Sequence, residues 1–172
     1  MPELSVVIPS VNGFADLSGC LQALGTQRTD PSLEVVVVDR LGSELRRRVA
    51  DQYPWVTLVE VEPMTSIPEM RAVGIKASKA PVVGVIEDHI LVRAGWVDAM
   101  LGAVSEGAEA VGGAIENAAT DTVVDWASFL CEYSQCLPPL PAGEVDWLTG
   151  NNVVYTRSIL ERHMDVIDRH GW

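Results

Sequence analysis

The residues with the clearest chemical potential in this sequence are Glu87, Asp88 and His89, which directly follow the apolar run 82–86. Carboxylates and imidazole are ligands for divalent cations, and charged groups that leave a buried segment lose solvation unless something binds them. The triplet therefore predicts a site for Mn²⁺ or Mg²⁺, with the imidazole favouring the softer Mn²⁺. The alternative is a solvated acidic turn in which the histidine is a bystander.

Two further polar turns also end apolar runs. The first spans residues 9–13, Pro-Ser-Val-Asn-Gly, and the second is Asp39 followed by Arg40. Either one alone is unremarkable, because Asn-Gly is a common turn and an aspartate at a strand end often caps the next helix. Together with residues 87–89, however, they predict three polar segments that converge on one ligand.

Glycine-rich phosphate-binding motifs are absent from the sequence. The turn at 9–13 lacks G-x-G-x-x-G, and G-x-x-x-x-G-K-[ST] occurs nowhere, which disfavours Rossmann dehydrogenases and P-loop enzymes. A phosphate ligand held without a glycine cradle needs a cation, and 87–89 is the only clustered set of hard ligands at a predicted strand end.

Four short runs rich in valine and isoleucine predict the strands that carry these turns. Each is too short for a helix and is apolar on both alternating faces, as in strands that are covered on both sides of a parallel sheet. They are residues 4–9, 33–39, 56–61 and 82–87.

Helical patterns lie between the four runs. Leu17, Leu21 and Leu24 form an i, i+4, i+7 leucine stripe, and Leu45 and Val49 form an apolar pair behind Ser43, a potential cap. Ser66 and Glu69 have the spacing of a capping box, ahead of a helix that ends near Ser78. The β-α-β-α-β-α-β alternation predicts an α/β fold, a three-layer α/β/α sandwich with a mainly parallel sheet. Ligands of such sheets bind beyond the carboxyl ends of the strands, where the three polar turns lie.

The second half of the chain has a looser pattern. It predicts helices at 96–106 and 123–133, strands at 110–115 and 153–155, and a proline-rich surface loop at 136–143. Thr156 is expected to cap a last helix that runs to about His163. With 172 residues, a single domain is expected.

Charge and composition exclude several classes of protein. The net charge of −12 disfavours a nucleic-acid partner. The longest basic run, 46–48, lies between Glu44 and Asp51 and is interpreted as one solvated helix face.

No signal peptide or membrane span is recognisable, so a cytoplasmic location is expected. The cysteines are interpreted as reduced, mostly buried thiols, with a zinc site or a catalytic thiol as alternatives: Cys20, Cys131 and Cys136.

Four segments occur in a recognisable order and spacing. They read SVVIPS at 5–10 with Asn12, EVVVVD at 34–39, RAVG at 71–74, and IEDH at 86–89 followed by Trp96. Over residues 4 to 160 the chain resembles a family 2 glycosyltransferase of the GT-A fold.

The resemblance implies a site for a nucleotide-sugar donor. In the family, the first turn and the second-strand aspartate hold the nucleotide, and they match Pro9, Ser10, Asn12 and Asp39 here. The helix arginine, which lies near base and phosphates, matches Arg71, and the D-x-D motif, which holds ribose and the metal-bound diphosphate, matches Glu87, Asp88 and His89. A G-x-N segment that lines the donor and acceptor cleft matches Gly150 and Asn152. Residues 4–89 would form the nucleotide-binding half and 90–172 the acceptor-side half.

The sequence also departs from the family pattern. Arg40 replaces the usual acidic residue after the second-strand aspartate, and the D-x-D motif is written Glu-Asp-His. The catalytic carboxylate of inverting members follows the helix after the G-x-N segment. Asp165 and Asp168 are the nearby acids, although helix-end surface charges are the competing interpretation, and the base is expected just beyond Trp172 of a truncated chain.

The function expected from the resemblance is transfer of a sugar from a UDP-sugar to a glycan or lipid-linked acceptor, inverting, assisted by Mn²⁺ or Mg²⁺, as in polysaccharide biosynthesis. Peripheral attachment to the inner membrane face is compatible with it. The alternatives are a nucleotidyltransferase and a nucleotide-binding module without catalysis. A nucleotidyltransferase would want a basic, glycine-rich loop after the first strand, and residues 10–14 contain no lysine or arginine.

Overall fold

The computed structural model describes residues 1–28 and 32–171, and these form a six-stranded sheet in the order β3-β2-β1-β4-β6-β5. The strands β1 to β4 run parallel to one another, whereas β6 runs antiparallel to both β4 and β5. Their bounds are β1 Leu4–Ser10, β2 Leu33–Asp39, β3 Val56–Glu60, β4 Val82–Ile86, β5 Ala110–Gly112 and β6 Asn152–Thr156. The predicted mainly parallel sheet is confirmed.

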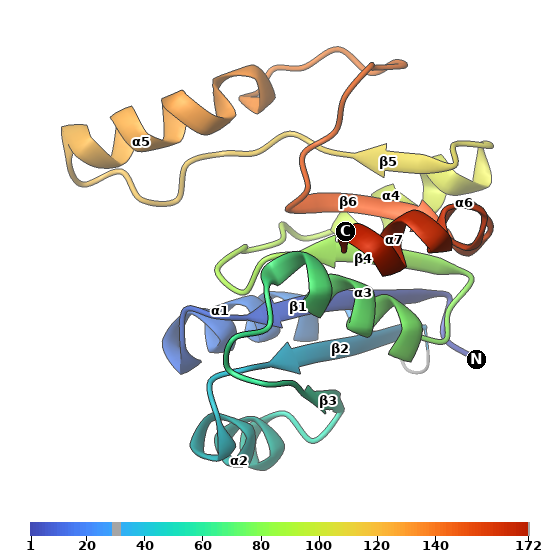
Figure 1. Cartoon of the computed structure of the whole chain (residues 1–172). Helices are drawn as coiled ribbons and strands as arrows, with labels where there is room; N and C mark the ends of the chain where they lie inside the picture. The colour runs from blue at the N-terminus through green and yellow to red at the C-terminus, as the bar shows by residue number, and fades with distance from the viewer. Residues whose placement is uncertain (29–31, 172) are drawn as a thin grey trace.

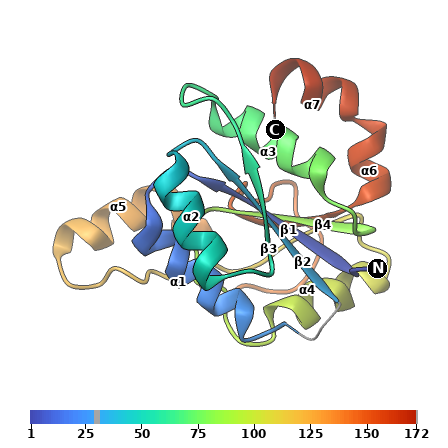
Figure 2. The ribbon, with the colours of Figure 1, turned by 90° about the horizontal axis from the view of Figure 1, so that it is seen from below.

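Helices cover both faces of the sheet. Figure 2 shows α1, α2 and α4 on one side of the strands and α3, α6 and α7 on the other, so the predicted three-layer sandwich is confirmed. Helix α5 lies apart from both layers and projects past the ends of the strands (Figure 1). The helices are α1 Phe14–Gly25, α2 Ser43–Gln52, α3 Ile67–Ala77, α4 Trp96–Ser105, α5 Val123–Tyr133, the short 3₁₀ turn η1 Ser134–Cys136, α6 Arg157–Arg162 and α7 Met164–His170.

Side chains alternate along each strand and therefore contribute to two separate hydrophobic cores, one on each face of the sheet. In β1, Leu4, Val6 and Ile8 pack into the core on the side of α1, α2 and α4, whereas Val7 packs on the side of α3. Because both faces are covered, every residue of β1 is buried. This double burial is the physical reason for the uninterrupted apolar runs in the sequence.

Gly74 sets the distance between α3 and the sheet. A Cβ atom at this position would lie 2.3 Å from Cγ1 of Val7 and 3.0 Å from Cγ2 of Val38, closer than side chains can approach. The missing side chain therefore lets α3 lie directly on β1 and β2. Arg71, one helical turn earlier, is brought by the same contact to the end of the sheet where the parallel strands finish.

Several local expectations need correction. Ser43 does not cap α2, because Gly42 is the N-cap residue and Ser43 is the first residue of the helix. The carboxylate of Asp39 accepts from the backbone N–H groups of Leu41 and Gly42 instead. The strand expected at 110–115 ends at Gly112. Helix α7, with two apolar residues packed inward, carried too short a pattern to be predicted from the sequence.

The basic run 46–48 does not form the single solvated face that the sequence indicates. Arg46 turns toward the sheet and donates to Asp39 at 2.9 Å and to Glu60 at 2.6 Å. Arg48 lies over the ring of Phe14. Arg47 alone keeps the expected exposed pairing, with two acidic residues on its own helix. The helix therefore divides its three guanidinium groups among different neighbours.

The three cysteines are free thiols, of which Cys20 and Cys136 are buried and Cys131 is exposed. Burial, followed by the charge of Asp88, raises the pKa of Cys20 to about 12, so this thiol is not a nucleophile at neutral pH. No helix within 1–28 and 32–171 combines the length and apolar character needed to cross a bilayer.

Candidate active site

Asp88 joins the turn after β4 to the turn after β1. Its side chain is fully buried, and Oδ2 accepts from the backbone N–H groups of Val11 at 2.7 Å and Asn12 at 2.8 Å. Oδ1 accepts from Nδ2 of Asn12 at 2.7 Å. A buried carboxylate with three donors is a well-satisfied structural anion. Asp88 therefore fixes the relative position of two of the three predicted polar turns.

Charge at this junction shifts two pKa values in opposite directions. Burial by itself would raise the pKa of Asp88, but hydrogen bonds from His89, Asn12 and Val11 outweigh it and lower the pKa. The hydrogen bond with Asp88 raises the pKa of His89 against the opposing effect of burial, and the charge of Glu87 adds to the rise. Asp88 is therefore held as a carboxylate, and His89 binds its proton more tightly than an isolated histidine does.

Glu87 and His89 lie on the more exposed side of Asp88, where the turn after β4 meets the turn after β1. Nε2 of His89 lies 3.5 Å from Oε2 of Glu87, and the His89 side chain is about half exposed. The other oxygen of Glu87 accepts from Nη2 of Arg71 at 3.1 Å. This ion pair places one cation beside two potential metal ligands.

The donor set fits a divalent cation only in part. Within the described ranges, no group of three His, Cys, Asp or Glu side chains is arranged to hold a metal ion. Both oxygens of Asp88 already accept hydrogen bonds, whereas Oε2 of Glu87 and Nε2 of His89 lie close enough to share one ion. The protein thus offers two ligands, and a cation there would need further oxygen ligands from water or from a diphosphate.

Asp39 ends β2 opposite Ser10, the last residue of β1. Its buried carboxylate accepts from the backbone N–H groups of Leu41 and Gly42 and from Arg46. The two backbone donors lie before the first turn of α2, which has no side-chain cap, so the helix-capping role considered from the sequence is not seen. Oδ1 accepts only the bond from Leu41 among those that the structure shows, which leaves acceptor capacity on that oxygen. Ser10 is also buried, and its hydroxyl has no hydrogen-bond partner among the described residues.

The asparagine that begins β6 and the one directly before it have different partners. Asn152 pairs in register with Ile86, and its side chain bonds Trp96 of α4 and the carbonyl of Ala114. Asn151 instead donates through Nδ2 to the hydroxyl of Tyr133 on α5 at 2.9 Å. Asn152, predicted to line the cleft, has its side chain engaged in holding α4, and Asn151 is the residue next to the end of β4 that faces away from α4.

The remaining predicted residues lie as follows. Pro9 is buried in β1 and Gly150 directly precedes Asn151. Asp165 and Asp168 are not brought to this site: both lie on α7, where Asp165 pairs with Arg169 and Asp168 with Lys76 of α3. A base beyond Trp172 falls outside the described residues.

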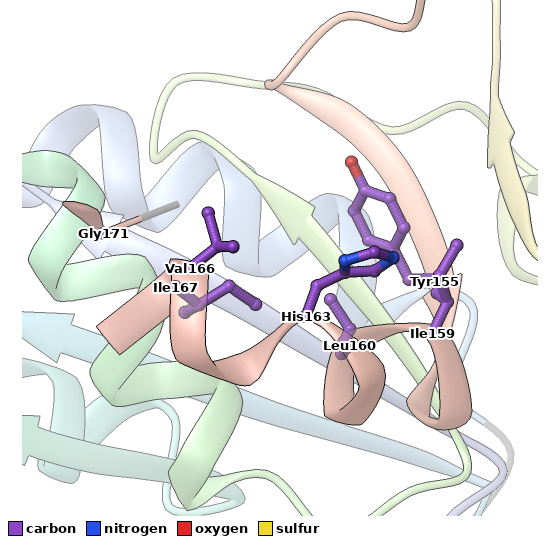
Figure 3. A pocket seen from close by; sticks show the side chains of 7 residues that line it. All are labelled: Tyr155, Ile159, Leu160, His163, Val166, Ile167 and Gly171. Atoms are coloured by element: carbon purple, nitrogen blue, oxygen red, sulfur yellow. The ribbon is translucent and has the colours of Figure 1, made fainter. Parts of the chain in front are cut away.

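Two cavities lie under α7 rather than at the strand ends. One, of about 280 Å³, lies between β6, α6 and α7, and Figure 3 shows the ring of His163 beside Tyr155 and Leu160 in its wall. The other, of about 330 Å³, lies between α7 and α3. Neither contains a residue of the 9–13 or 87–89 turns.

Comparison with protein families matches residues 5–163 to glycosyl transferase family 2. The match covers most of the chain, which therefore belongs to glycosyl transferase family 2 and is a glycosyltransferase domain of the GT-A fold. No curated protein matches the sequence.

Solved structures resemble the chain at low sequence identity. TarS 1-349 of S. aureus has a TM-score of 0.73 at 16% identity, over 95% of this chain and 49% of that one. TarS in complex with UDP-GlcNAc has a TM-score of 0.69 at 17% identity, over 95% and 47%. Mannosyltransferase PcManGT from Pyrobaculum calidifontis, in complex with GDP-Man and Mn²⁺, has a TM-score of 0.62 at 21% identity, over 94% and 46%. The chain spans about half the length of these solved chains, and the likeness is one of fold.

Sequence reasoning missed the bond between Asn151 and Tyr133 and the bond between Arg46 and Asp39. The side-chain alternation of β6, counted back from buried Val153, could have separated Asn151 from Asn152. Nothing in the local pattern of α5 distinguishes Tyr133 from an ordinary helix-end aromatic residue, because its partner lies 18 positions away.

Proposed function

We propose that this domain transfers a sugar from a nucleoside-diphosphate sugar, a UDP-sugar, to a glycan or lipid-linked acceptor, with inversion at the transferred carbon. The observation that supports this proposal most strongly is the junction at Asp88, which holds the turn after β1 against Glu87 and His89. Asp39 ends the neighbouring strand, so base, ribose and diphosphate contacts can follow one another along a single sheet edge.

Different residues along this edge of the sheet bind different parts of the donor. The remaining acceptor capacity of Asp39 suits an N–H of the base or a ribose hydroxyl. Arg71, largely buried beside Glu87, offers positive charge to a diphosphate in a chain whose net charge is −12. Asn12 and Val11 do not bind the donor through the groups that Asp88 engages. They shape the turn, so their contribution is the position of the backbone.

Glu87 and His89 would hold Mn²⁺ or Mg²⁺ together with oxygens of the diphosphate. When bound, such a cation supplies the positive charge that stabilises the departing nucleoside diphosphate. His89 must be neutral to act as a ligand, and Glu87 must divide its carboxylate between Arg71 and the ion. The carboxylate that deprotonates the acceptor is proposed to lie outside the described residues, because Asp165 and Asp168 pair with basic residues on and beside α7.

Calorimetry with UDP and with GDP, each in Mn²⁺ and in EDTA, tests this function. We expect UDP to bind more tightly in Mn²⁺, because the cation offsets the repulsion between an acidic chain and a diphosphate. Equal dissociation constants in Mn²⁺ and EDTA would replace the metal-assisted account with one in which arginines alone neutralise the donor. Tighter binding of GDP than of UDP would overturn the choice of base.

A nucleotide-binding module without catalysis is the second candidate, and it is favoured by one observation: Asp165 and Asp168 of α7 pair with Arg169 and Lys76. Release of UDP from UDP-sugars in the presence of acceptor glycans separates the two. Turnover supports the transferase and overturns the module.

A further inference from the structure

Helix α5 presents an apolar face to solvent. Val123, Trp126 and Leu130 occur at i, i+3 and i+7, so they lie along one side of the helix, and they are 86%, 39% and 43% exposed. These three side chains are termed the α5 stripe. Phe129 is the buried residue of the helix, and Tyr133 at its C-terminal end bonds Asn151. The helix is therefore held on one side and at one end, and the α5 stripe is left uncovered.

Little in the described chain stabilises α5 by packing. The helix has 11 residues, and isolated helices shorter than about 12 to 15 residues are marginal in water. A capping box of Thr122 and Asp125 supports the first turn, but it does not cover the α5 stripe. Most helical stability in proteins comes from packing of an apolar face, and grouped exposed apolar side chains mark interaction sites. The α5 stripe therefore has the character of a docking surface.

The charge around α5 indicates what kind of molecule fits this surface. Residues 94–156 contain nine acidic residues and no lysine, arginine or histidine. Asp121, Asp125 and Glu132 lie on or directly beside the helix, and none forms an ion pair in the part of the chain that the structure describes. Uncompensated negative charge attracts cationic groups. The surface therefore favours a partner that carries positive charge beside apolar residues.

The same charges disfavour two other occupants. A second copy of the chain would bring Asp121, Asp125 and Glu132 of each α5 close together, and like charges across an interface repel. Membranes with anionic lipids attract amphipathic helices that carry lysine and arginine, and α5 has neither. A basic protein segment meets both requirements, because its apolar side chains can cover the α5 stripe while its lysines or arginines face the acidic residues.

We propose that α5 is a docking helix for another protein, and that the partner segment is a cationic amphipathic helix that packs on the α5 stripe. Apolar residues of the partner at i, i+3, i+4 and i+7 would contact Val123, Trp126 and Leu130, with basic residues toward Asp121 and Glu132. The helix projects past the ends of the strands, where a partner has access to it (Figure 1). The inference goes beyond the proposed function, because the contact requires no nucleotide.

The test uses the whole chain and two synthetic helical peptides. Both carry leucine at i, i+3, i+4 and i+7, and the remaining positions are lysine in one peptide and glutamate in the other. Calorimetry measures binding of each peptide in low and in high salt. We expect the lysine peptide to bind in low salt and more weakly in high salt, because salt screens the attraction, and the glutamate peptide not to bind.

Variants locate the contact on α5. The double variant Val123→Ser, Leu130→Ser should weaken binding of the lysine peptide by about tenfold or more, as expected when central apolar contacts are lost. Glu132→Lys should weaken it by about two- to tenfold, and a lysine near the C-terminal end suits the helix dipole, so the helix is retained. Circular dichroism checks the helix content of each variant. The controls Met64→Ser and Glu62→Lys change an exposed apolar and an exposed acidic residue after β3, and should match wild type.

Four results would overturn the proposal. Wild type does not bind the lysine peptide, or it binds the peptide no better than the double variant does, in which case the net charge of −12 alone attracts it. Binding to vesicles of phosphatidylcholine and phosphatidylglycerol that the double variant loses would assign the α5 stripe to a membrane. A dimer in sedimentation that the double variant abolishes would assign it to a second copy. None of these results depends on nucleotide binding, so the proposed function is tested separately.

Discussion

Asp88→Ala is the substitution whose effect follows most directly from the structure. The side chain is fully buried and accepts three hydrogen bonds, two of them from the backbone N–H groups of Val11 and Asn12. Hydrogen bonds to charged groups contribute about 1.5 to 3 kcal/mol each, and an unsatisfied buried donor costs about 1 to 3 kcal/mol. Bonds that share one carboxylate are not additive. We therefore expect the free energy of unfolding to fall by roughly 3 to 5 kcal/mol.

Urea denaturation at several pH values measures this loss. The folded-state pKa of Asp88 lies below its ordinary value of 3.8, so its stabilisation is complete above that value and is lost as the pH falls toward the folded-state pKa. The difference between wild type and variant should shrink below about pH 4. It should also decrease as the pH rises through the raised pKa of His89, because Asp88 is the main cause of that rise. The control Asp51→Ala removes an exposed partner of Arg47 and should cost less than about 0.5 kcal/mol. A loss at Asp88 as small as that of the control would refute the account of the junction.

The remaining predictions concern packing, the metal and the nucleotide. Gly74→Ala should destabilise the fold by about 1 to 3 kcal/mol in thermal or urea unfolding, because its Cβ would overlap Val7, whereas Gly102→Ala in α4, with open space around it, should be neutral or stabilising; equal effects would contradict the close approach of α3. His89→Ala should lose about tenfold or more of the Mn²⁺-dependent gain in UDP affinity. In wild type that gain should decline as the pH falls through a value above the ordinary histidine pKa of 6.5, since the pKa of His89 is raised and protonation competes with the metal. A flat profile down to about pH 5.5 would remove His89 from the ligand set. Asp39→Ala should weaken UDP binding by about 1 to 3 kcal/mol in calorimetry and also lower stability, because Asp39 holds Leu41, Gly42 and Arg46; unchanged UDP affinity would reduce its role to structure.

The parallel half of the fold was predictable because its signals are local. The valine-rich runs of β1, β2 and β4 are buried on both faces and form central strands as predicted, whereas β3 is an edge strand that is only partly buried, contrary to the coverage expected for it. The capping box at Ser66 and Glu69 is present as predicted. These predictions succeeded because each depends on residues within one strand or one helical turn.

Long-range partners could not be read from the sequence. Arg46 was interpreted as part of a solvated face, but its guanidinium reaches Asp39 and Glu60 across a helix and two strands. The resemblance placed Asn152 in the cleft, and its sequence position does not reveal that its side chain bonds Trp96 while the side chain of Asn151 bonds Tyr133. The role of Asp88 as a link between turns depends on 76 residues of intervening chain and has no local signature.

The account rests on a nucleoside diphosphate and a divalent cation meeting at the ends of β1, β2 and β4. Amide NMR spectra of the labelled protein, recorded with UDP in Mg²⁺ and then with a trace of paramagnetic Mn²⁺, test this directly. The account predicts shifted signals at Val11 to Gly13 and at Leu41 and Gly42, with Mn²⁺ broadening centred on Glu87 to His89. Broadening centred on α7 and its cavities, with the signals of residues 87–89 unaffected, would contradict it.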